Sequence, residues 1–478
     1  MKRALVATAA ALLAATLLLF ARGAYPTPGS DAPSFLASAI NHRLGRGLVN
    51  PLYPQIRWAD PTGAARHVYY PPLFPLAVSA LLPTPTPAAA FVAVALMQCA
   101  SLALCALLGW RVIAADGDPG WAAVLLLVAS LAGLCTSLLP TQGRPEALAL
   151  PLLLLGALAA VHLRGAALIA ALGVLLGLMA ATHPIGAVEA GLAAALVFAF
   201  RRPARAALPA LALIALLAAA VCAGVLALSP HGLRESLAGM ARAYPHTPWT
   251  APPGRDWWRP WVVLRRATFY GPLFLLALAA GAALVRRRAP AARALFACAA
   301  VLLAAAVYHG SLTHKSLRNY NAILLAPLAY ALVLAWFRHS GGAFRLLSAA
   351  IVAATAAGFA GHALCFPWYR AHAHTLARAR AEWAALALPP EPRVLLRGNL
   401  WALAEDYGRI DLDPRVLEDP SRPRPLLVLG QRREHGGHAP EVPGFRLVHD
   451  GFNPALAEAG WRRLFVDEDY SFAVYQPR

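Results

Sequence analysis

The stretch AAAFVAVALMQCASLALCALLGWRVIA, residues 88–114, decides the fold class of this chain. Its one charged residue, Arg111, lies near its end. A transmembrane helix needs about 20 consecutive, mainly apolar residues, so this stretch is long enough to cross a bilayer. Similar runs, rich in Ala, Leu and Val, recur along most of the first 366 residues. Together they predict a polytopic α-helical membrane protein.

Composition and charge support this class. Of the 478 residues, 59% are hydrophobic and 14% are charged, which is far too apolar for a soluble protein. The net charge of +19 comes largely from short arginine clusters between apolar runs: Arg201, Arg202, Arg205, Arg286, Arg287, Arg288 and Arg293. Such clusters set the orientation of membrane helices. Because no separate basic domain with interleaved aromatic residues follows, we expect membrane lipids and no nucleic acid as partners.

Placing the arginine-rich turns in the cytoplasm gives about eleven spans, with the N-terminus cytoplasmic and the C-terminus outside a cytoplasmic (inner) membrane. The expected spans are 4–21, 88–114, 121–140, 146–163, 166–182, 184–200, 207–228, 271–285, 294–308, 321–337 and 346–366. Lys2 and Arg3 before the first run fit a cleaved signal peptide or a retained anchor, and we favour the anchor. Pro184 divides an apolar stretch that is too long for one crossing.

The polar segments then gather on the outer face, as the loop 22–87, the turn 140–146, the loop 229–270 and the tail 367–478. In the first loop we expect a surface-lying helix, Ala32–Gly45, and a re-entrant segment, Leu73–Leu82, which would roof a cavity. The chain therefore divides into a membrane domain, 1–366, and a soluble extracytoplasmic domain, 367–478.

The tail has the composition of a small α/β domain. We expect a helix near Ala371–Leu388 and strands at Arg393–Leu396, Pro425–Leu429, Phe445–Val448 and Phe472–Tyr475. The six cysteines all lie in or beside apolar segments, where Cys behaves as a small apolar residue. This placement argues against a disulfide framework.

Asp31 stands about ten residues after the first span, at the start of the expected surface helix. Ser30 or Asp31 suits the N-cap of that helix, where a negative charge complements the helix dipole. Alternatively, Asp31 faces the cavity as a general base that deprotonates an acceptor.

Gly143-Arg144-Pro145-Glu146 forms an outer turn before the next span. Arg144 can bind a phosphate or a carboxylate, and Glu146 begins a helix. An arginine at the membrane interface and an acidic residue at a helix start are also ordinary anchors.

Taken in order, these features resemble the bacterial GT-C glycosyltransferases, among them the protein O-mannosyltransferases and the lipid A aminoarabinose transferases. The resemblance covers residues 1 to about 366 and rests on the first span, Asp31, the segment Tyr70-Pro71-Pro72-Leu73 and the turn at Arg144. It implies that Asp31 is the catalytic base, that Glu146 and Tyr70 line the cavity, and that the donor is a polyprenyl-phosphate-linked sugar. The family usually has Asp-Glu where this chain has Asp31-Ala32, so one carboxylate is missing.

Two ionisable residues lie close to or within the expected hydrocarbon layer. His183 and Glu189 are candidates for substrate contact, because such groups are costly inside a membrane. In the resembling family a Lys often stands where this chain has His183. The alternative for His183 is a structural role, satisfying backbone carbonyls that Pro184 frees.

The donor phosphate needs cations at the outer interface. Lys315 and Arg318 are our preferred ligands, since the resemblance includes a Lys-containing outer turn, and His314 and Tyr320 beside them are expected to line the cavity. Arg255 and Arg259, interleaved with Trp residues, and Arg144 are further candidates. The segment around Arg255 also fits a plain aromatic belt.

No zinc-ligand spacing, nucleotide-binding glycine loop or nucleophile elbow occurs in a suitable context. Asp31 and Glu146 could share a metal ion, but we expect no metal and no cofactor. The sequence therefore predicts a glycosyltransferase that uses a lipid-linked sugar and an undetermined glycan, lipid or protein acceptor. A polytopic transporter or lipid flippase is the alternative, and a non-catalytic envelope scaffold is a third interpretation.

Overall fold

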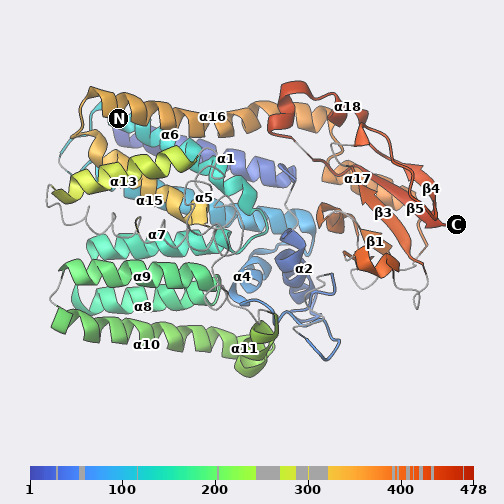
Figure 1. The fold of residues 1–478 in the computed structure, drawn as a ribbon, viewed down its shortest axis with the longest axis horizontal. Coiled ribbons are helices and arrows are strands. Elements are labelled where there is room, and N and C mark those ends of the chain that lie inside the picture. The colour runs from blue at the N-terminus through green and yellow to red at the C-terminus, as the bar shows by residue number, and fades with distance from the viewer. Residues whose placement is uncertain are drawn as a thin grey trace, which may run out of the picture.

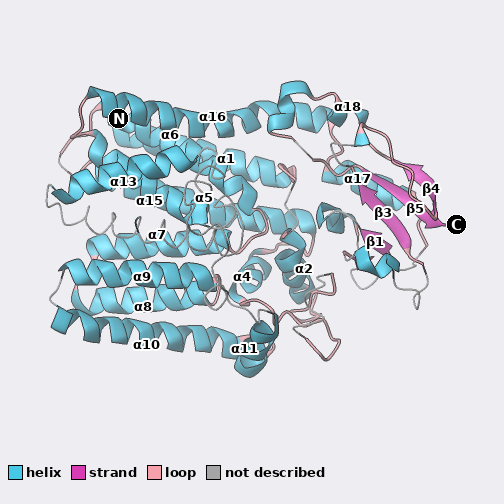
Figure 2. Cartoon of the chain, in the orientation of Figure 1, coloured by secondary structure: helices cyan, strands magenta, loops and turns pink. Residues whose placement is uncertain are grey.

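The structure is a computed structural model. It describes residues 1–27, 31–52, 60–115, 117–201, 204–243, 270–286, 300, 321–389, 393–395, 398–404, 410–412, 414–418, 424–431, 435–466 and 468–478. Most of these residues form helices that lie side by side, and a small sheet lies near the C-terminus (Figures 1 and 2). The prediction of a mainly helical protein with a mixed C-terminal region is therefore confirmed.

The helices of the bundle follow the apolar runs closely. They are α1 (Lys2–Arg22), α5 (Pro87–Ile113), α6 (Trp121–Leu138), α7 (Glu146–His162), α8 (Gly165–Ala180), α9 (Pro184–Arg201), α10 (Ala204–Leu228), α13 (Tyr270–Arg286), α15 (Asn321–Phe337) and α16 (Gly342–His372). Within the described ranges, five helical segments are long and apolar enough to cross a membrane: Lys2–Arg22, Pro87–Ile113, Trp121–Leu138, Ala207–Leu228 and Gly342–Ala385. The expected span 294–308 lies outside the described residues, so eleven spans stay a prediction.

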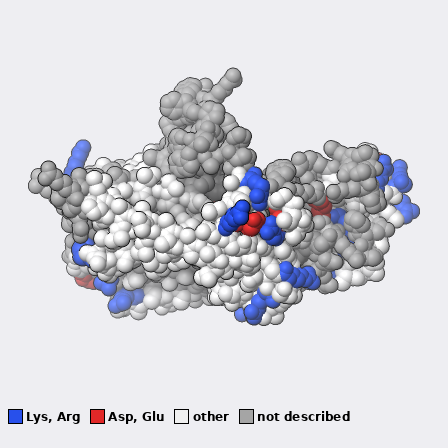
Figure 3. Space-filling model, turned by 90° about the horizontal axis from the view of Figure 1, so that it is seen from below, with Lys and Arg blue, Asp and Glu red and all other residues white. Residues whose placement is uncertain are grey.

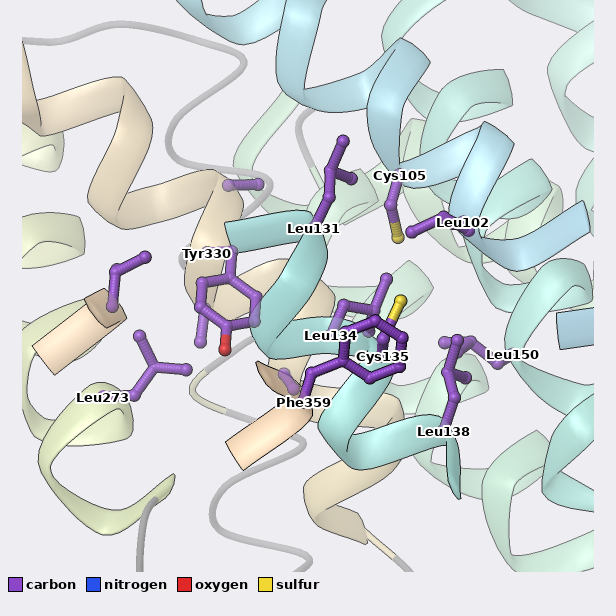
Figure 4. Packing of buried hydrophobic residues seen from close by; sticks show 14 of the residues in the cluster. Leu102, Cys105, Leu131, Leu134, Cys135, Leu138, Leu150, Leu273, Tyr330 and Phe359 are labelled. Carbon is purple, nitrogen blue, oxygen red and sulfur yellow. The ribbon is translucent and has the colours of Figure 1, made fainter. Parts of the chain in front are cut away.

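Small residues let the bundle pack closely, as membrane helices require. Figure 4 shows Tyr330 of α15 close to Leu131 and Leu134 of α6. A Cβ atom at Gly133 of α6 would lie 2.3 Å from the Tyr330 hydroxyl, and that hydroxyl donates to Thr355 Oγ1 of α16 at 2.9 Å. Because Gly133 has no side chain, α6, α15 and α16 can pack closely at this point.

One end of the bundle collects basic side chains. Lys2 Nζ pairs with Asp118 Oδ2 at 2.5 Å. Arg338, after α15, donates to the backbone oxygens of Ile113 at 2.7 Å and Asp118 at 3.2 Å. The N-terminus and the turns after α5 and α15 therefore meet at the same end.

The opposite end holds short helices that come from different loops: α2 (Ala32–Arg43), α4 (Leu73–Leu81) and α11 (Gly232–Ala243). The Leu73 backbone N–H donates to the oxygen of Ala181, at the end of α8, at 3.1 Å. The expected helix at Ala32–Gly45 is thus present, and the segment Leu73–Leu82 forms a helix, whose re-entry into the membrane stays a prediction.

The helix α2 does not lie on the surface, however, and this part of the prediction was wrong. Ala32–Asn41 are all buried. Its Ala and Ser side chains are short, so neighbours approach from all sides. The cluster that contains Leu36 also includes Phe74 of α4 and Trp401 of the tail.

The tail packs against the end that carries α2. Helix α16 continues past residue 366 to His372, and α17 (Leu376–Ala385) lies within the expected helix. The sheet has the order β2-β1-β3-β5-β4. Its strands are β1 (Arg393–Leu395), β2 (Ile410–Asp411), β3 (Leu426–Gly430), β4 (Phe445–Asp450) and β5 (Phe472–Pro477). The first three are parallel and the last two pair antiparallel.

All four expected strands are present, and only the two-residue β2 was missed. Thr27, just after α1, donates its hydroxyl to the Glu468 backbone oxygen at 2.8 Å, and Phe91 of α5 contacts Trp401 edge-on. These contacts join the tail to the bundle.

Candidate active site

Asp31 occupies the N-cap position of α2, but its side chain makes no capping hydrogen bond. Its Oδ2 atom instead accepts from Arg144 Nη1 at 2.6 Å. The carboxylate therefore points toward a turn that is more than one hundred residues away in sequence. Its side chain is 46% exposed, so a molecule outside the protein can reach it.

The turn that carries Arg144 fits against α2 because of a glycine. Gly143 has a φ of +85°, a left-handed conformation that glycine adopts at no steric cost. A Cβ atom at this position would lie 2.6 Å from Ala32 Cβ and 3.1 Å from Leu36 Cδ1. Gly143 thus lets the turn approach the first residues of α2 and brings Arg144 within reach of Asp31.

Arg144 joins two carboxylates. It donates from Nε to Glu146 Oε2 at 3.2 Å and from Nη2 to Oε1 at 2.7 Å, while Nη1 binds Asp31. Such a two-point pairing is geometrically specific and stronger than a neutral hydrogen bond. All three nitrogen atoms of the Arg144 guanidinium bind carboxylates. This favours a role for Arg144 in positioning these carboxylates over the phosphate contact expected from the sequence.

Glu146 is the first residue of α7, and its side chain is 1% exposed. A buried carboxylate is stable only when it is paired, and Arg144 supplies the pairing. His183, which is 2% exposed, places Nε2 3.8 Å from Glu146 Oε1. The ring therefore contributes the fourth member of a cluster made of Asp31, Arg144, Glu146 and His183, called here the carboxylate cluster.

The tautomer of His183 follows from its second contact. Its Nδ1 atom accepts from the Gly186 backbone N–H at 2.9 Å, so the proton of a neutral ring lies on Nε2, directed at Glu146. The sequence suggested that His183 binds backbone carbonyls freed by Pro184. In the structure the ring instead accepts a hydrogen bond from a backbone N–H just after Pro184. The His183 ring thus binds a backbone N–H in the first turn of α9 and also faces Glu146.

Chemically, the carboxylate cluster holds two acidic groups of different accessibility. Glu146 is enclosed and bound to Arg144, whereas Asp31 is half-exposed and uses one oxygen for Arg144. Asp31 is therefore the group that can take up a proton from an incoming molecule. Among the described residues, no group of three or more His, Cys, Asp or Glu side chains is arranged to hold a metal ion.

The other candidates fall into two groups. Tyr70 is half-buried and packs edge-on against Phe35 of α2, with ring centroids 5.1 Å apart. Glu189 belongs to α9, but its side chain lies outside the described part of the structure. The same holds for every remaining cation and cavity residue expected from the sequence: Arg255, Arg259, His314, Lys315, Arg318 and Tyr320.

Sequence reasoning missed a second charged group, which joins the loop before α4 to α11. Asp60 accepts from Arg66 Nη2 at 2.9 Å, and the same Arg66 nitrogen lies 3.2 Å from Glu235 Oε2 of α11. Burial raises the pKa of Asp60, but hydrogen bonds from Arg66 and Thr62 outweigh it and hold the pKa well below its usual range. The Asp60-Pro61-Thr62-Gly63 turn was the signal, since Asp often binds the backbone two residues on.

No protein-family model, curated protein or solved structure matches this chain.

Proposed function

We propose that this protein is a membrane glycosyltransferase of the GT-C kind, which moves a sugar from a polyprenyl-phosphate donor to an acceptor at the end of the bundle that carries the carboxylate cluster. The observation that supports the proposal is the meeting of Asp31, Arg144, Glu146 and His183, which come from three separate parts of the sequence. The resemblance carried by the sequence points to the same part of the chain. Structural pairing alone would not require an exposed carboxylate there.

In the proposed reaction Asp31 accepts the proton of an acceptor hydroxyl or amine. The acceptor atom then bonds to the anomeric carbon of the sugar, and the bond from that carbon to the phosphate oxygen breaks. The electron pair leaves with the polyprenyl phosphate, and the anomeric configuration inverts. Arg144 orients Asp31, and Glu146 holds Arg144 in place.

The leaving polyprenyl phosphate gains one negative charge and then carries two close to the membrane, and cations there would stabilise it. Lys315 and Arg318 remain our proposed ligands, with Arg255 and Arg259 as further ones. The bilayer itself holds the isoprenoid chain of the donor. We assign no role to a metal or an organic cofactor.

For orientation, we propose that the protein spans a cytoplasmic (inner) membrane and that its basic end faces the cytoplasm. Lys2, Arg338 and Arg345 lie at that end, in agreement with the rule that cytoplasmic loops are rich in Lys and Arg. The carboxylate cluster and the tail then lie outside, where nucleotide sugars are absent and a lipid-linked donor is needed.

A panel of radiolabelled polyprenyl phosphosugars tests this proposal. Purified protein in vesicles should release polyprenyl phosphate from one of them and transfer the sugar to a membrane-extract acceptor. Movement of intact labelled lipid between leaflets, without cleavage of the sugar–phosphate bond, would instead establish the alternative, a lipid flippase or transporter. Lack of both activities across the panel would count against both functions.

A further inference from the structure

Helix α11 has a buried face and an open face, and the two have different surroundings. Residues 232, 236, 239 and 243 are Gly, Ser, Gly and Ala, and they repeat at helical spacing. This small-residue face packs inward: Ser236 and Gly239 are buried, and a Cβ atom on Gly239 would lie 2.5 Å from Val68 Cβ. The loop that carries Val68 therefore covers only one side of α11.

The opposite side of α11 is open and has mixed character. Arg234, Leu237, Ala241 and Arg242 are all exposed, and Leu237 is 51% exposed. Leu233 and Met240 are partly exposed and lie on the same side as Leu237. An apolar strip thus runs beside two arginines, and this combination is typical of helices that lie in a membrane interface.

The position of α11 in the chain fits such a location. It begins four residues after the end of α10, whose segment Ala207–Leu228 is one of the five helical segments suited to cross a membrane. Leu228, the last residue of α10, is 88% exposed, and Leu208, Leu213 and Leu216 of α10 are exposed too. Figure 1 shows α11 turned away from the axis of α10 at its end. The exposed apolar surface of α10 therefore leads directly into α11.

The charged residues of α11 indicate which kind of lipid headgroup its open face would bind. Glu235 is the only acidic residue of α11, and it pairs with Arg66. The other two charged residues of the helix, Arg234 and Arg242, are both basic and exposed. Figure 3 shows basic side chains gathered around acidic ones on the face seen from below, the side on which α10 and α11 lie in Figure 1. Arg43 and Arg46, at the end of α2, are also exposed near this end of the bundle.

We infer that the open face of α11 binds anionic phospholipid headgroups. Leu233, Leu237 and Met240 insert among the upper acyl chains, and Arg234 and Arg242 contact the phosphates. Each basic residue near an anionic membrane surface contributes on the order of 1 kcal/mol, which corresponds to about five-fold in local lipid enrichment. This inference requires that α10 cross the membrane, and it does not depend on the proposed transferase activity.

Photocrosslinking tests the inference at a single position. Full-length protein carrying benzoylphenylalanine in place of Leu237 is placed in vesicles with a minor fraction of phosphatidylglycerol in phosphatidylcholine, each radiolabelled in turn. We expect crosslinks to phosphatidylglycerol several-fold above its mole fraction. The double variant Arg234→Gln/Arg242→Gln should bring the ratio back to the mole fraction, whereas Arg164→Gln, an exposed arginine at the opposite end, should not.

The same probe at Leu213, an exposed position within α10, serves as the control for hydrocarbon contact. It should label both lipids in proportion to their amounts, because acyl chains carry no charge. Proportional labelling at position 237 in the unaltered background would overturn the inference. Crosslinks from position 237 to protein in place of lipid, or an enrichment that survives the double variant, would overturn it too.

Discussion

At the scale of single residues, Arg144 connects the candidate site. It binds the half-exposed Asp31 on one side and the buried Glu146 on the other. A buried ion pair contributes little net free energy to folding, because the cost of desolvation offsets the attraction. Removal of one partner, however, leaves an uncompensated buried charge. The main energetic effect of Arg144 is therefore that it compensates the buried charge of Glu146. The net strength of its two ion pairs matters less.

Replacing Arg144 by Gln should destabilise the protein by about 3–5 kcal/mol, since Glu146 would be left buried without its partner. The double variant Arg144→Gln/Glu146→Gln should recover a large part of this loss. Thermal unfolding of the detergent-purified single and double variants measures the coupling between the two residues. Strictly additive effects would show that the pair seen here does not form in the membrane.

Gly143→Ala should weaken the site without changing any charge. Alanine pays about 1–2 kcal/mol for the left-handed backbone, and its Cβ atom would collide with Ala32. We expect a lower melting temperature and slower sugar transfer. Gly120→Ala is the matched control, because Gly120 has a φ of −63° and open space around it. Equal behaviour of the two variants would mean that the turn does not hold α2.

At the scale of elements, α2 is anchored by a buried polar network. His67 Nδ1 lies 2.7 Å from Ser38 Oγ, and Asn50 donates to the backbone oxygens of Pro33 and Ser34, both at 2.9 Å. Buried hydrogen bonds of this kind restrict the movement of the element they hold. The first residue of the helix, and Asp31 before it, are thereby fixed.

His67 gives this network a dependence on pH. Burial, together with the charge of nearby His231, lowers the pKa of His67 to about 3. An unfolded chain takes up this proton near pH 6.5, so the stabilising contribution is complete above that pH and falls as the pH drops from about 6.5 toward 3. The limiting slope for one proton is about 1.4 kcal/mol per pH unit.

Comparison of the wild type with His67→Gln, by thermal unfolding between pH 7 and pH 4, checks this expectation. The variant should be less stable at pH 7 but should lose less stability on acidification. An identical pH dependence in both proteins would rule out His67 as the group responsible.

The sequence predicts the long elements well because their cause is local. Apolar length places α5 and α10 within a few residues, and the composition of the tail predicts four of its five strands. The burial of α2 could not be read from the sequence, since it depends on contacts with α4 and Trp401. Likewise, the sequence indicates three candidate site residues separately, each from its own local pattern: Asp31, Glu146 and His183. Their connection through Arg144 arises only when the loops meet in space.

At the scale of the whole molecule, the two ends of the bundle carry different groups. Lys2, Arg338 and Arg345 mark one end, and the carboxylate cluster, α11 and the tail mark the other. We expect an alkaline phosphatase fused after Arg478 to be active in cells and a green fluorescent protein at the same place to be dark. The reverse pattern would place the tail in the cytoplasm and invert the proposed topology.

The central claim, that Asp31 is the proton acceptor in sugar transfer, is tested most directly by turnover of Asp31→Asn. Asparagine keeps the shape of the side chain but cannot act as the base. We expect transfer from the active polyprenyl phosphosugar to fall by a factor of about 100 or more, while the yield and melting temperature of the protein change little. Asp118→Asn, an exposed carboxylate at the opposite end, should retain full transfer. If Asp31→Asn transfers sugar at the wild-type rate, Asp31 is not the base and the proposed mechanism is wrong.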